Sequence, residues 1–351
     1  MINVKFEVND ELLKVLRTAE NILSYNKTET SLKYLNLTNN KGKLKIIARS
    51  PFMRLEYIVE STSEINGDSA LYENKTLIPL LRVAKDNVII NDGQIKCSGC
   101  KYKIPCMDSK DYPDDVLPAI ASVDILEAEQ FKQAIDNVLI ATDKTTSAVL
   151  SGVYIGDNVA IGCDSNRIIM QKIEGIAHIK DIVLSKEVIK EIPNLPFKGV
   201  IKASVFGGNI IFKDENITLC SALLSEKYPK VEQVMPKELK NIVLIKKDSL
   251  YNALVMVSPI LDDETKKCIL EYTDSEMQIT SINGADEAKI KISIEAEQPI
   301  DNPVEVKFNM QFLSDMAKIS GENITMESYK DNIGYMFNSG EVKQYIMPLI
   351  N

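Results

Sequence analysis

The fold is decided by a short stretch near the start of the chain, Val4-Lys-Phe-Glu-Val-Asn-Asp-Glu-Leu-Leu-Lys-Val-Leu16. Apolar and polar residues alternate over Val4–Val8, and this pattern predicts a half-buried strand. Between Glu11 and Leu23 apolar residues recur with an i, i+4 spacing, as at Leu12 and Leu16, and this pattern predicts an amphipathic helix. The stretch therefore predicts a strand followed directly by a helix.

The same strand and helix pattern occurs twice more, at equal intervals along the chain. Phe131 and Leu250 correspond to Leu12, and the two successive intervals are 119 residues each. The additional helices are expected over Ala128–Thr142 and Lys247–Ser258, after strands over Val123–Leu126 and Ile242–Ile245. A fixed interval of this kind indicates internal repetition.

Each third also contains a second, weaker helix pattern between strands. These helices are expected over Lys75–Lys85, Lys186–Ile192 and Asn309–Ile319. The segment Ser109-Lys-Asp-Tyr-Pro113 lies 116 residues before Ser225-Glu-Lys-Tyr-Pro229. Helices separated by several strands favour antiparallel sheet packed on helices, whereas a single α/β domain with accidental symmetry is the alternative. We therefore predict an α+β fold of three repeated domains, each with two helices packed on antiparallel sheet, over residues 1–118, 119–238 and 239–351.

Composition narrows the classes of function. The 351 residues are 45% hydrophobic and 26% charged, as in folded globular proteins. Lys and Arg number 41 against 50 Asp and Glu, for a net charge of −9. This balance argues against a surface that is basic throughout and leaves room for a local basic stripe. Because the chain has one histidine, His178, histidine-based hydrolytic or metal chemistry has little support.

The sequence also indicates the cellular compartment in which the protein is expected. No stretch approaches 18 uninterrupted apolar residues, so we expect no membrane span. The first residues are charged and lack the apolar core of a signal peptide. Six scattered cysteines without a secretory signal are expected to be thiols. We therefore expect a cytoplasmic protein.

Candidate catalytic and metal patterns fail on inspection. Cys97-x-x-Cys100 with Cys106 lacks the further ligands of a zinc site, and it lies in strand-like sequence, not at the start of a helix. Asp262-Asp263-Glu264 is typical of a solvent-facing acidic turn. The chain contains neither a GxxxxGK[ST] nor a GxGxxG motif. We expect no catalytic residue, no metal and no cofactor.

Several segments share a specific resemblance. In chain order they are Gly162-Cys-Asp-Ser-Asn-Arg-Ile168, Lys227-Tyr-Pro-Lys-Val-Glu-Gln-Val-Met-Pro236, Phe308-Asn309 with Phe312-Leu313, and Tyr345-Ile-Met-Pro-Leu349. Together with the opening segment they resemble, in the same order, segments of the bacterial sliding clamps, the beta subunit of DNA polymerase III. The resemblance covers essentially the whole chain.

This resemblance implies an architecture and a function. Three similar domains per chain would form half of a ring, and two chains paired head to tail would close it around duplex DNA without reading its sequence. The ring would tether a replicative DNA polymerase. A clamp loader and other proteins that carry clamp-binding motifs would be further partners.

The resemblance also implies three sets of site residues. The expected DNA contacts are Lys27, Lys75, Lys144, Lys186 and Lys267. The expected peptide-binding groove comprises Leu150, Cys163, Ser165, Asn166, Arg167, Ile168, Pro229, Gln233, Val234, Phe312, Asn332, Gly334, Tyr345, Met347, Pro348 and Leu349. The expected dimer interface comprises Tyr102, Ile104, Ile260 and Leu261.

The groove departs from the family pattern. Ser165-Asn166 replaces Gly-His, Cys163 replaces Thr, and Gln233 replaces a usual basic residue. We therefore expect a groove whose peptide preference differs from the common one. Two alternatives stay open at this point: a cytosolic enzyme with a cysteine nucleophile, and a clamp-fold scaffold that binds peptides but no longer encircles DNA.

Overall fold

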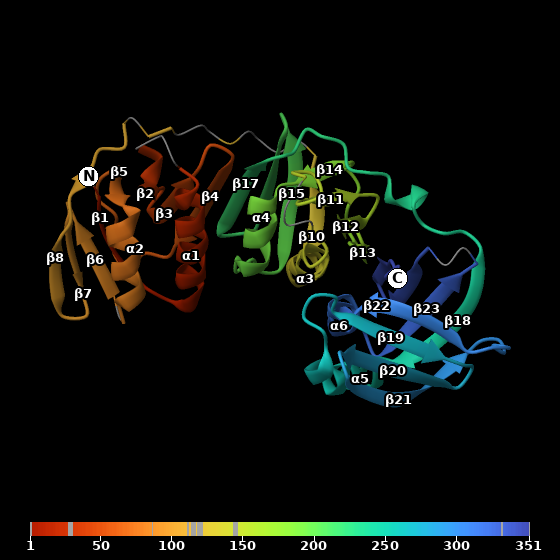
Figure 1. Cartoon of the computed structure of the whole chain (residues 1–351). Helices are drawn as coiled ribbons and strands as arrows, with labels where there is room; N and C mark the ends of the chain where they lie inside the picture. The colour runs from red at the N-terminus through yellow and green to blue at the C-terminus, as the bar shows by residue number, and fades with distance from the viewer. Residues whose placement is uncertain are drawn as a thin grey trace. The chain divides into compact units, whose positions relative to one another are not determined.

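The structure is a computed structural model that describes residues 2–26, 31–85, 87–110, 112–113, 117, 122–142, 147–330 and 333–350 (Figure 1). The chain divides into two compact units. Unit 1 comprises residues 1–133 and 174–225, and unit 2 comprises residues 134–173 and 226–351. Among the described residues, no helix has the length and hydropathy that a membrane span requires.

The order of elements is the same in three successive parts of the chain: a strand, a helix, four strands, a second helix and three strands. The first part contains β1 (Asn3–Glu7), α1 (Asp10–Ser24), β2 (Tyr34–Asn40), β3 (Lys43–Arg49), β4 (Met53–Val59), β5 (Ser69–Glu73), α2 (Asn74–Val83), β6 (Asn87–Asn91), β7 (Gln94–Cys97) and β8 (Cys100–Lys103). The short strand β9 (Cys106–Met107) follows them.

The second and third parts repeat this order. The second contains β10 (Asp124–Glu127), α3 (Ala128–Leu139), β11 (Val153–Gly156), β12 (Val159–Cys163), β13 (Arg167–Lys172), β14 (Ile182–Leu184), α4 (Lys186–Glu191), β15 (Val200–Phe206), β16 (Asn209–Lys213) and β17 (Ile217–Ala222). The third contains β18 (Leu239–Lys246), α5 (Lys247–Val257), β19 (Lys267–Tyr272), β20 (Glu276–Asn283), β21 (Asp286–Ala296), β22 (Val304–Asn309), α6 (Met310–Ile319), β23 (Asn323–Tyr329), β24 (Tyr335–Ser339) and β25 (Val342–Ile346).

The helices lie where the sequence spacing predicts them, and local chemistry fixes their starts. The Asn9 side chain accepts a hydrogen bond from the Leu12 N–H at 2.9 Å and caps α1. Asn309 caps α6 in the same way through the Gln311 N–H. The predicted division at residues 118 and 238 stays a prediction, and residue 118 lies outside the described part.

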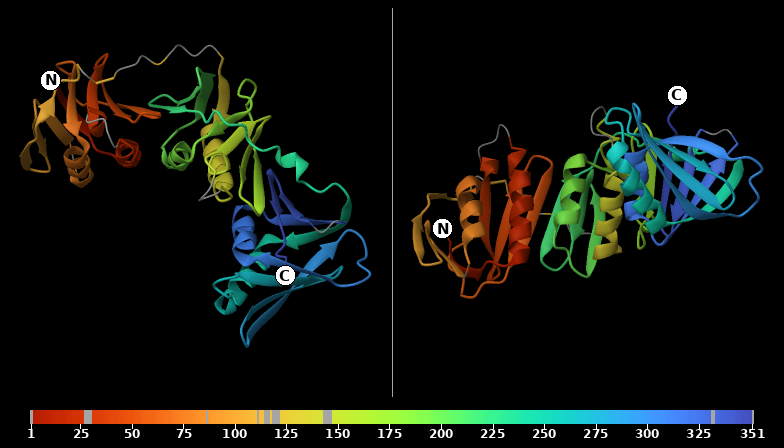
Figure 2. Two further views of the ribbon diagram at one scale, coloured as in Figure 1. Left: turned by 45° about the horizontal axis from the view of Figure 1, so that its top comes forward. Right: turned by 60° about the horizontal axis from the view of Figure 1, so that its bottom comes forward.

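Unit 1 contains two antiparallel sheets. One has the strand order β1-β6-β7-β8, and the other has the order β10-β15-β16-β17-β4-β3-β2-β5-β9. The second sheet joins strands of the first and second repeats, because β17 pairs with β4 and places Cys220 opposite Arg54. Helices α1, α2 and α4 lie on one side of the sheets of this unit (Figure 2).

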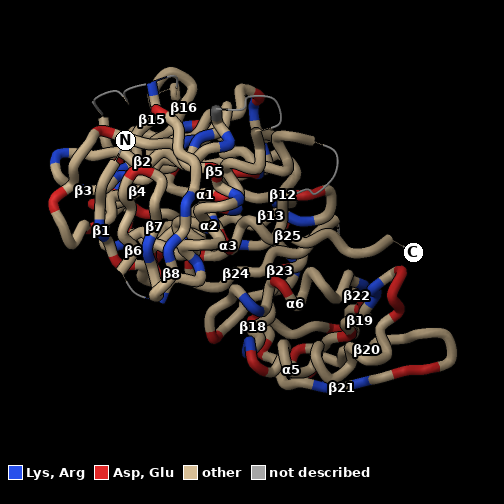
Figure 3. Tube along the Cα trace, turned by 90° about the vertical axis from the view of Figure 1, so that its left-hand side faces the viewer, with Lys and Arg blue, Asp and Glu red and all other residues tan. Residues whose placement is uncertain are grey.

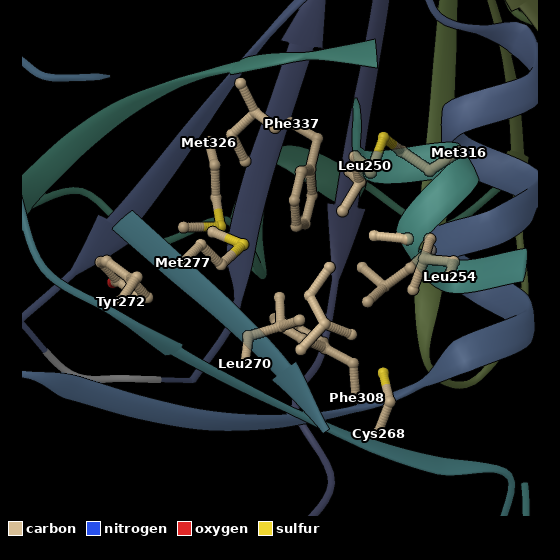
Figure 4. Packing of buried hydrophobic residues seen from close by; sticks show 14 of the residues in the cluster. Leu250, Leu254, Cys268, Leu270, Tyr272, Met277, Phe308, Met316, Met326 and Phe337 are labelled. Carbon is tan, nitrogen blue, oxygen red and sulfur yellow. The ribbon is translucent and has the colours of Figure 1, made fainter. Parts of the chain in front are cut away.

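Unit 2 is built on one antiparallel run of strands, in the order β11-β12-β13-β25-β24-β23-β18-β21-β20-β19-β22. Here β25 pairs with β13 and places Tyr345 opposite Ile168. Side chains from α5, α6 and the sheet, among them Leu254, Met316 and Phe337, point into a shared core (Figure 4). The Phe308 ring packs edge-on against Tyr335 with centroids 5.2 Å apart.

Two buried carboxylates in unit 1 have opposite electrostatic environments. Burial raises the pKa of Asp124, but the backbone N–H groups of residues 177–179 and the His178 ring donate to it, so that its pKa is lowered overall. Burial dominates at Glu191 and raises its pKa, even though Asn21 donates a 3.0 Å hydrogen bond to it. Ionised Asp124 therefore stabilises the fold, whereas ionised Glu191 opposes it.

Candidate peptide-binding groove

The turn between β12 and β13 is held by one aspartate. Asp164 Oδ1 accepts hydrogen bonds from the backbone N–H groups of Asn166 at 2.9 Å and Arg167 at 3.0 Å. This side-chain turn leaves Ser165 and Asn166 exposed at its tip. Gly162 before the turn lets β12 approach α3 closely, since a Cβ there would lie 2.1 Å from the Val138 carbonyl oxygen.

Arg167 ties this turn to two helices. Its guanidinium forms ion pairs with Asp164 at 3.1 Å and Asp315 at 2.9 Å. It also donates to the Ile140 carbonyl oxygen at 2.6 Å, just past the end of α3, and lies 4.3 Å from the centroid of the Phe312 ring. Arg167 is buried among these groups and holds the turn in place, and its assignment to the peptide-binding groove stays a prediction.

An apolar cluster lies beside this turn. We name it the groove cluster, and its buried members are Ile161, Cys163, Ile168, Val231, Tyr329, Met336 and Tyr345. Partly buried side chains pack around it: Leu150, Tyr154, Val159, Met170, Tyr228, Met235 and Met347. Partly exposed aromatic and methionine side chains on a buried apolar base suit an apolar peptide side chain, because they can adapt to it.

The connector between β17 and β18 forms one wall. The Tyr228 hydroxyl donates to Cys163 Sγ at 3.3 Å, and the Tyr228 ring packs against Tyr154 with centroids 5.6 Å apart. Burial raises the pKa of Tyr228, so that its hydroxyl stays protonated and remains a donor. The connector is therefore fixed to the end of β12 through Cys163.

The C-terminal segment also packs against the groove cluster, through Tyr345 and Met347. The Met347 N–H donates to the Asn166 carbonyl oxygen at 2.9 Å, and the Leu349 N–H donates to the Lys307 carbonyl oxygen at 2.8 Å. The Tyr345 ring packs directly on Gly334, where a Cβ would lie 2.2 Å from ring carbons. The last residues are thus pinned along the rim of the cluster.

A second candidate surface lies on the helices of unit 1. Lys14 and Arg17 on α1 and Lys75 on α2 are exposed. Arg82 on α2 is also exposed and forms a 2.5 Å ion pair with Glu20. Such side chains can contact phosphates without reading sequence.

The strand pairs that join successive repeats follow a common rule. In each internal seam, the last strand of one repeat pairs with the third strand after the first helix of the preceding repeat, as β17 does with β4 and β25 with β13. By this rule the remaining strands are β8, the last of repeat one, and β21, the equivalent third strand of repeat three. β21 lies between β18 and β20, but it pairs with β18 only over residues 294–296, whereas residues 286–293 pair with β20. Figure 3 marks basic positions near β8 and both basic and acidic positions along β21.

Comparisons with known proteins agree with this geometry. No protein-family model matches the chain. The beta sliding clamp of Mycoplasmopsis pulmonis is 23% identical over 78% of both chains, and that of Mycoplasma capricolum is 23% identical over 96% of both. The crystal structure of the Helicobacter pylori beta clamp bound to a DNA ligase peptide matches all of both chains, with a TM-score of 0.85 and 17% identity. The chain is similar to the bacterial beta sliding clamps in sequence and fold.

The structure of this chain brings together part of the expected groove. Leu150, Cys163, Ile168, Tyr345 and Met347 belong to or pack against the groove cluster. Arg167, Phe312 and Gly334 lie beside it as buried or half-buried supports, and Pro348 and Leu349 are half-buried along the C-terminal segment. Ser165, Asn166, Pro229, Gln233 and Val234 are exposed, and Asn332 lies outside the described residues. Their assignment to a ligand site stays a prediction.

Sequence reasoning missed several cluster members. These are Tyr154, Val159, Ile161, Met170, Tyr228, Val231, Met235, Tyr329 and Met336. Tyr228, Val231 and Met235 stand inside the segment that carries the family resemblance, so their apolar character was a usable signal. The strand residues could not be found in the same way, because alternation alone does not tell which face of a sheet supports a site.

The remaining expected residues fall in different environments. Lys75 is exposed in the first turn of α2, Lys186 is half-buried at the start of α4, and Lys267 starts β19. Lys27 and Lys144 lie outside the described residues. The exposed helix cations Lys14, Arg17, Arg82 and Lys190 were missed, because sequence alone does not orient a helix face.

The expected interface residues also differ in exposure. Tyr102 on β8 is 36% exposed, whereas Ile104, after β8, is 6% exposed and donates its N–H to the Gly93 carbonyl oxygen at 2.7 Å. Ile260 and Leu261 are half-buried after α5. None of the six cysteines, all in described segments, forms a disulfide, and within those segments no group of three or more His, Cys, Asp or Glu could hold a metal ion.

Proposed function

We propose that this chain is a DNA sliding clamp. Two copies pair head to tail into a ring around duplex DNA, and the ring tethers the replicative DNA polymerase for processive synthesis. A clamp loader and other proteins with clamp-binding motifs bind to the same groove. The chain performs no catalysis in this role, and it acts in the cytoplasm.

The observation that carries the proposal is the common construction of the two internal seams. Each seam is a backbone-paired strand join between successive repeats. The same join between β8 of one copy and β21 of a second copy supplies the third seam, and two copies supply it twice. This head-to-tail interface closes upon itself, so that assembly stops at two chains. It also pairs the edge strand β8, and unpaired edge strands promote aggregation.

Charge supports the proposed seam. β8 is exposed along its whole length and carries Lys101 and Lys103. β21 carries Asp286, Glu287 and Glu295 against Lys289 and Lys291, so that it is acidic at its start and has a net charge of −1. Opposite charges on two edges favour their approach in the correct pairing and disfavour the pairing of β8 with another β8.

The proposed interaction with DNA needs only weak contacts. A closed ring retains the duplex by topology, and its lining must tolerate a sliding polyanion. α1 and α2 carry the cations Lys14, Arg17, Lys75 and Arg82 against three acidic residues, a net charge of +1 on a chain whose net charge is −9. This distribution is the one expected if the acidic surface faces solvent and the helices face DNA.

The groove cluster supplies the proposed tethering site. Its apolar base, with Tyr154, Met170 and Met347 around it, fits a short peptide with leucine or aromatic side chains. The Helicobacter pylori structure holds a DNA ligase peptide, and we extend peptide binding of this kind to the present chain.

The test combines solution mass with retention on DNA. Light scattering at micromolar concentration should give twice the chain mass of 39.3 kDa. Tyr102→Asp should reduce the mass to that of one chain, because it places a charge in the seam, whereas Val83→Asp, at a residue 65% exposed on α2, should leave the dimer intact. After loading, the dimer should remain on circular DNA and leave linear DNA.

Two results would contradict the proposal. If the unaltered protein has the mass of a single chain, it does not form the proposed ring. A dimer that binds peptide but is never retained on circular DNA would favour the peptide-binding scaffold instead.

A further inference from the structure

Two cysteines face each other at the end of the β7–β8 hairpin. Cys97 is the last residue of β7, Cys100 is the first residue of β8, and the two are paired directly across the hairpin. Directly opposite residues on antiparallel strands have Cα atoms about 4.5–5.5 Å apart. A disulfide needs a Cα separation of about 4.4–6.8 Å. The backbone therefore holds these cysteines at a distance that a disulfide can span.

The turn between the two cysteines fixes this arrangement. Ser98 and Gly99 have φ angles of 49° and 79°. A two-residue loop with both φ angles positive is the type I′ turn, which matches the twist of a hairpin. Ser98 Oγ also accepts a hydrogen bond from the Lys85 N–H at 3.0 Å, and this bond attaches the turn to the segment that follows α2. The two cysteines are thus kept in register by a defined turn.

Both cysteine side chains project from the same face of the hairpin. Residues paired directly across antiparallel strands point to the same side of the sheet, so Cys97 and Cys100 share a face with the next such pair, Ile95 and Tyr102. A hydrogen bond to the Cys100 side chain raises the pKa of Tyr102, and the Cys97 thiol adds to this effect. The two sulfurs and the Tyr102 hydroxyl therefore form one cluster.

The two thiols differ in accessibility. Cys97 is 4% exposed, whereas Cys100 is exposed on β8, the last strand of its sheet. A small molecule in solvent therefore reaches Cys100 first, and the neighbouring Cys97 can act as the second thiol. Redox-sensing cysteines have this pattern of an accessible thiol beside a resolving one. Pairing of β8 with a second copy would use main-chain groups in the plane of the sheet, whereas these side chains project from its face.

A disulfide at this hairpin is expected to be reversible. It would close a loop with two residues between the cysteines, and cross-linking a short loop stabilises a fold less than cross-linking a long one. Exposed disulfides are generally the labile or regulatory ones. The hairpin is therefore suited to alternate between a dithiol and a disulfide.

We propose that Cys97 and Cys100 are a reversible redox site, which forms a disulfide across the β7–β8 hairpin on reaction with a low-molecular-weight disulfide such as oxidised glutathione. The site goes beyond the proposed function, because the reaction requires neither DNA nor a second copy of the chain.

The reaction has two exchange steps. The Cys100 thiolate attacks one sulfur of the oxidant, the S–S bond of the oxidant breaks, and one reduced thiolate leaves. Cys97 then gives its proton to solvent and attacks Cys100 Sγ in the mixed disulfide, and the second reduced thiolate leaves. Together the two cysteines lose two electrons and two protons, which convert the oxidant into two reduced thiols.

The first experiment follows the thiols after oxidation of the full, folded chain. The chain is incubated with oxidised glutathione and then unfolded in N-ethylmaleimide before mass spectrometry. We expect Cys97 and Cys100 to escape alkylation and to be joined in a peptide map, with no glutathione left on either. Dithiothreitol, removed before alkylation, should restore both thiols. Full alkylation of both after oxidation, glutathione that persists on Cys100, or a disulfide that joins either residue to another cysteine would overturn the proposal.

The second experiment uses single substitutions under the same treatment. Cys97→Ser should accumulate glutathione on Cys100, because no second thiol displaces it. Cys106→Ser, which removes a half-buried cysteine from β9, is the matched control and should form the Cys97–Cys100 disulfide as the parent does. If Cys97→Ser does not fold, Cys100→Ser decides, since it changes an exposed side chain, and Cys97 should then be alkylated in full. A folded Cys97→Ser without the adduct, or a Cys97 that escapes alkylation in Cys100→Ser, would refute the site.

Discussion

The contact between Gly334 and Tyr345 makes the groove testable with one methyl group. In Gly334→Ala, the new Cβ would lie 2.2 Å from two ring carbons of Tyr345 and 2.3 Å from its hydroxyl oxygen. Ordinary contacts of a Cβ begin near 3.4 Å, so the ring must move by more than an ångström. Tyr345 is 2% exposed, and its neighbours oppose this movement. Overpacking of this kind costs about 1–3 kcal/mol.

The same displacement should weaken peptide binding, because Tyr345 forms part of the groove cluster. We expect about a tenfold loss of affinity for a fluorescein-labelled peptide with a leucine–phenylalanine pair, measured by fluorescence anisotropy, together with a lower melting temperature. Gly321→Ala is the matched control, since its Cβ would meet only Ser339 Oγ at 3.4 Å. If the two variants bind and melt alike, the assignment of Tyr345 to the groove is refuted.

Four further outcomes are expected. Asp124→Asn should lower the free energy of unfolding at pH 7 by about 2 kcal/mol, and the difference should shrink as pH falls through the lowered pKa of Asp124, as urea unfolding at pH 3 to 7 would show. Glu191→Gln should stabilise the chain at pH 7. Because the fold raises the pKa of Glu191, it favours the neutral carboxyl group, and the free energy of unfolding falls as pH rises through that pKa, whereas glutamine stays neutral. A variant no more stable than the parent would contradict this. Arg167→Ala should cost about 3–5 kcal/mol in denaturant unfolding, since it leaves partly buried carboxylates without their cation. Arg17→Glu combined with Lys75→Glu should weaken DNA retention and reduce its dependence on salt, whereas an unchanged salt slope would exclude these side chains from the lining.

Much of the fold could be predicted because its signals are local. The i, i+4 spacing at Leu12, Phe131 and Leu250 places three helices, and the interval between these residues indicates the repetition that the element order displays. Asn9 and Asn309 mark helix starts through their own side chains. Neither signal needs knowledge of what lies across the sheet.

The site could be predicted only in part, because its walls come from distant segments. Cys163 and Tyr345 were found through the family resemblance, but Met336 and Tyr329 join them only once β23, β24 and β25 are paired. Arg167 was expected to face a peptide. Its partner Asp315 lies 148 residues away in sequence, and no local pattern indicates that this pair buries the guanidinium.

The repeats are joined through main-chain hydrogen bonds along β4–β17 and β13–β25. Main-chain hydrogen bonds form between N–H and C=O groups and do not require particular side chains. An evolving chain could therefore replace residues along these seams without losing the joints. This gives a physical reason for a backbone held at a TM-score of 0.85 while identity fell to 17%. It also lets one seam place Arg54 opposite Cys220 while the other places Ile168 opposite Tyr345, so that the same joint carries different side chains in the two units.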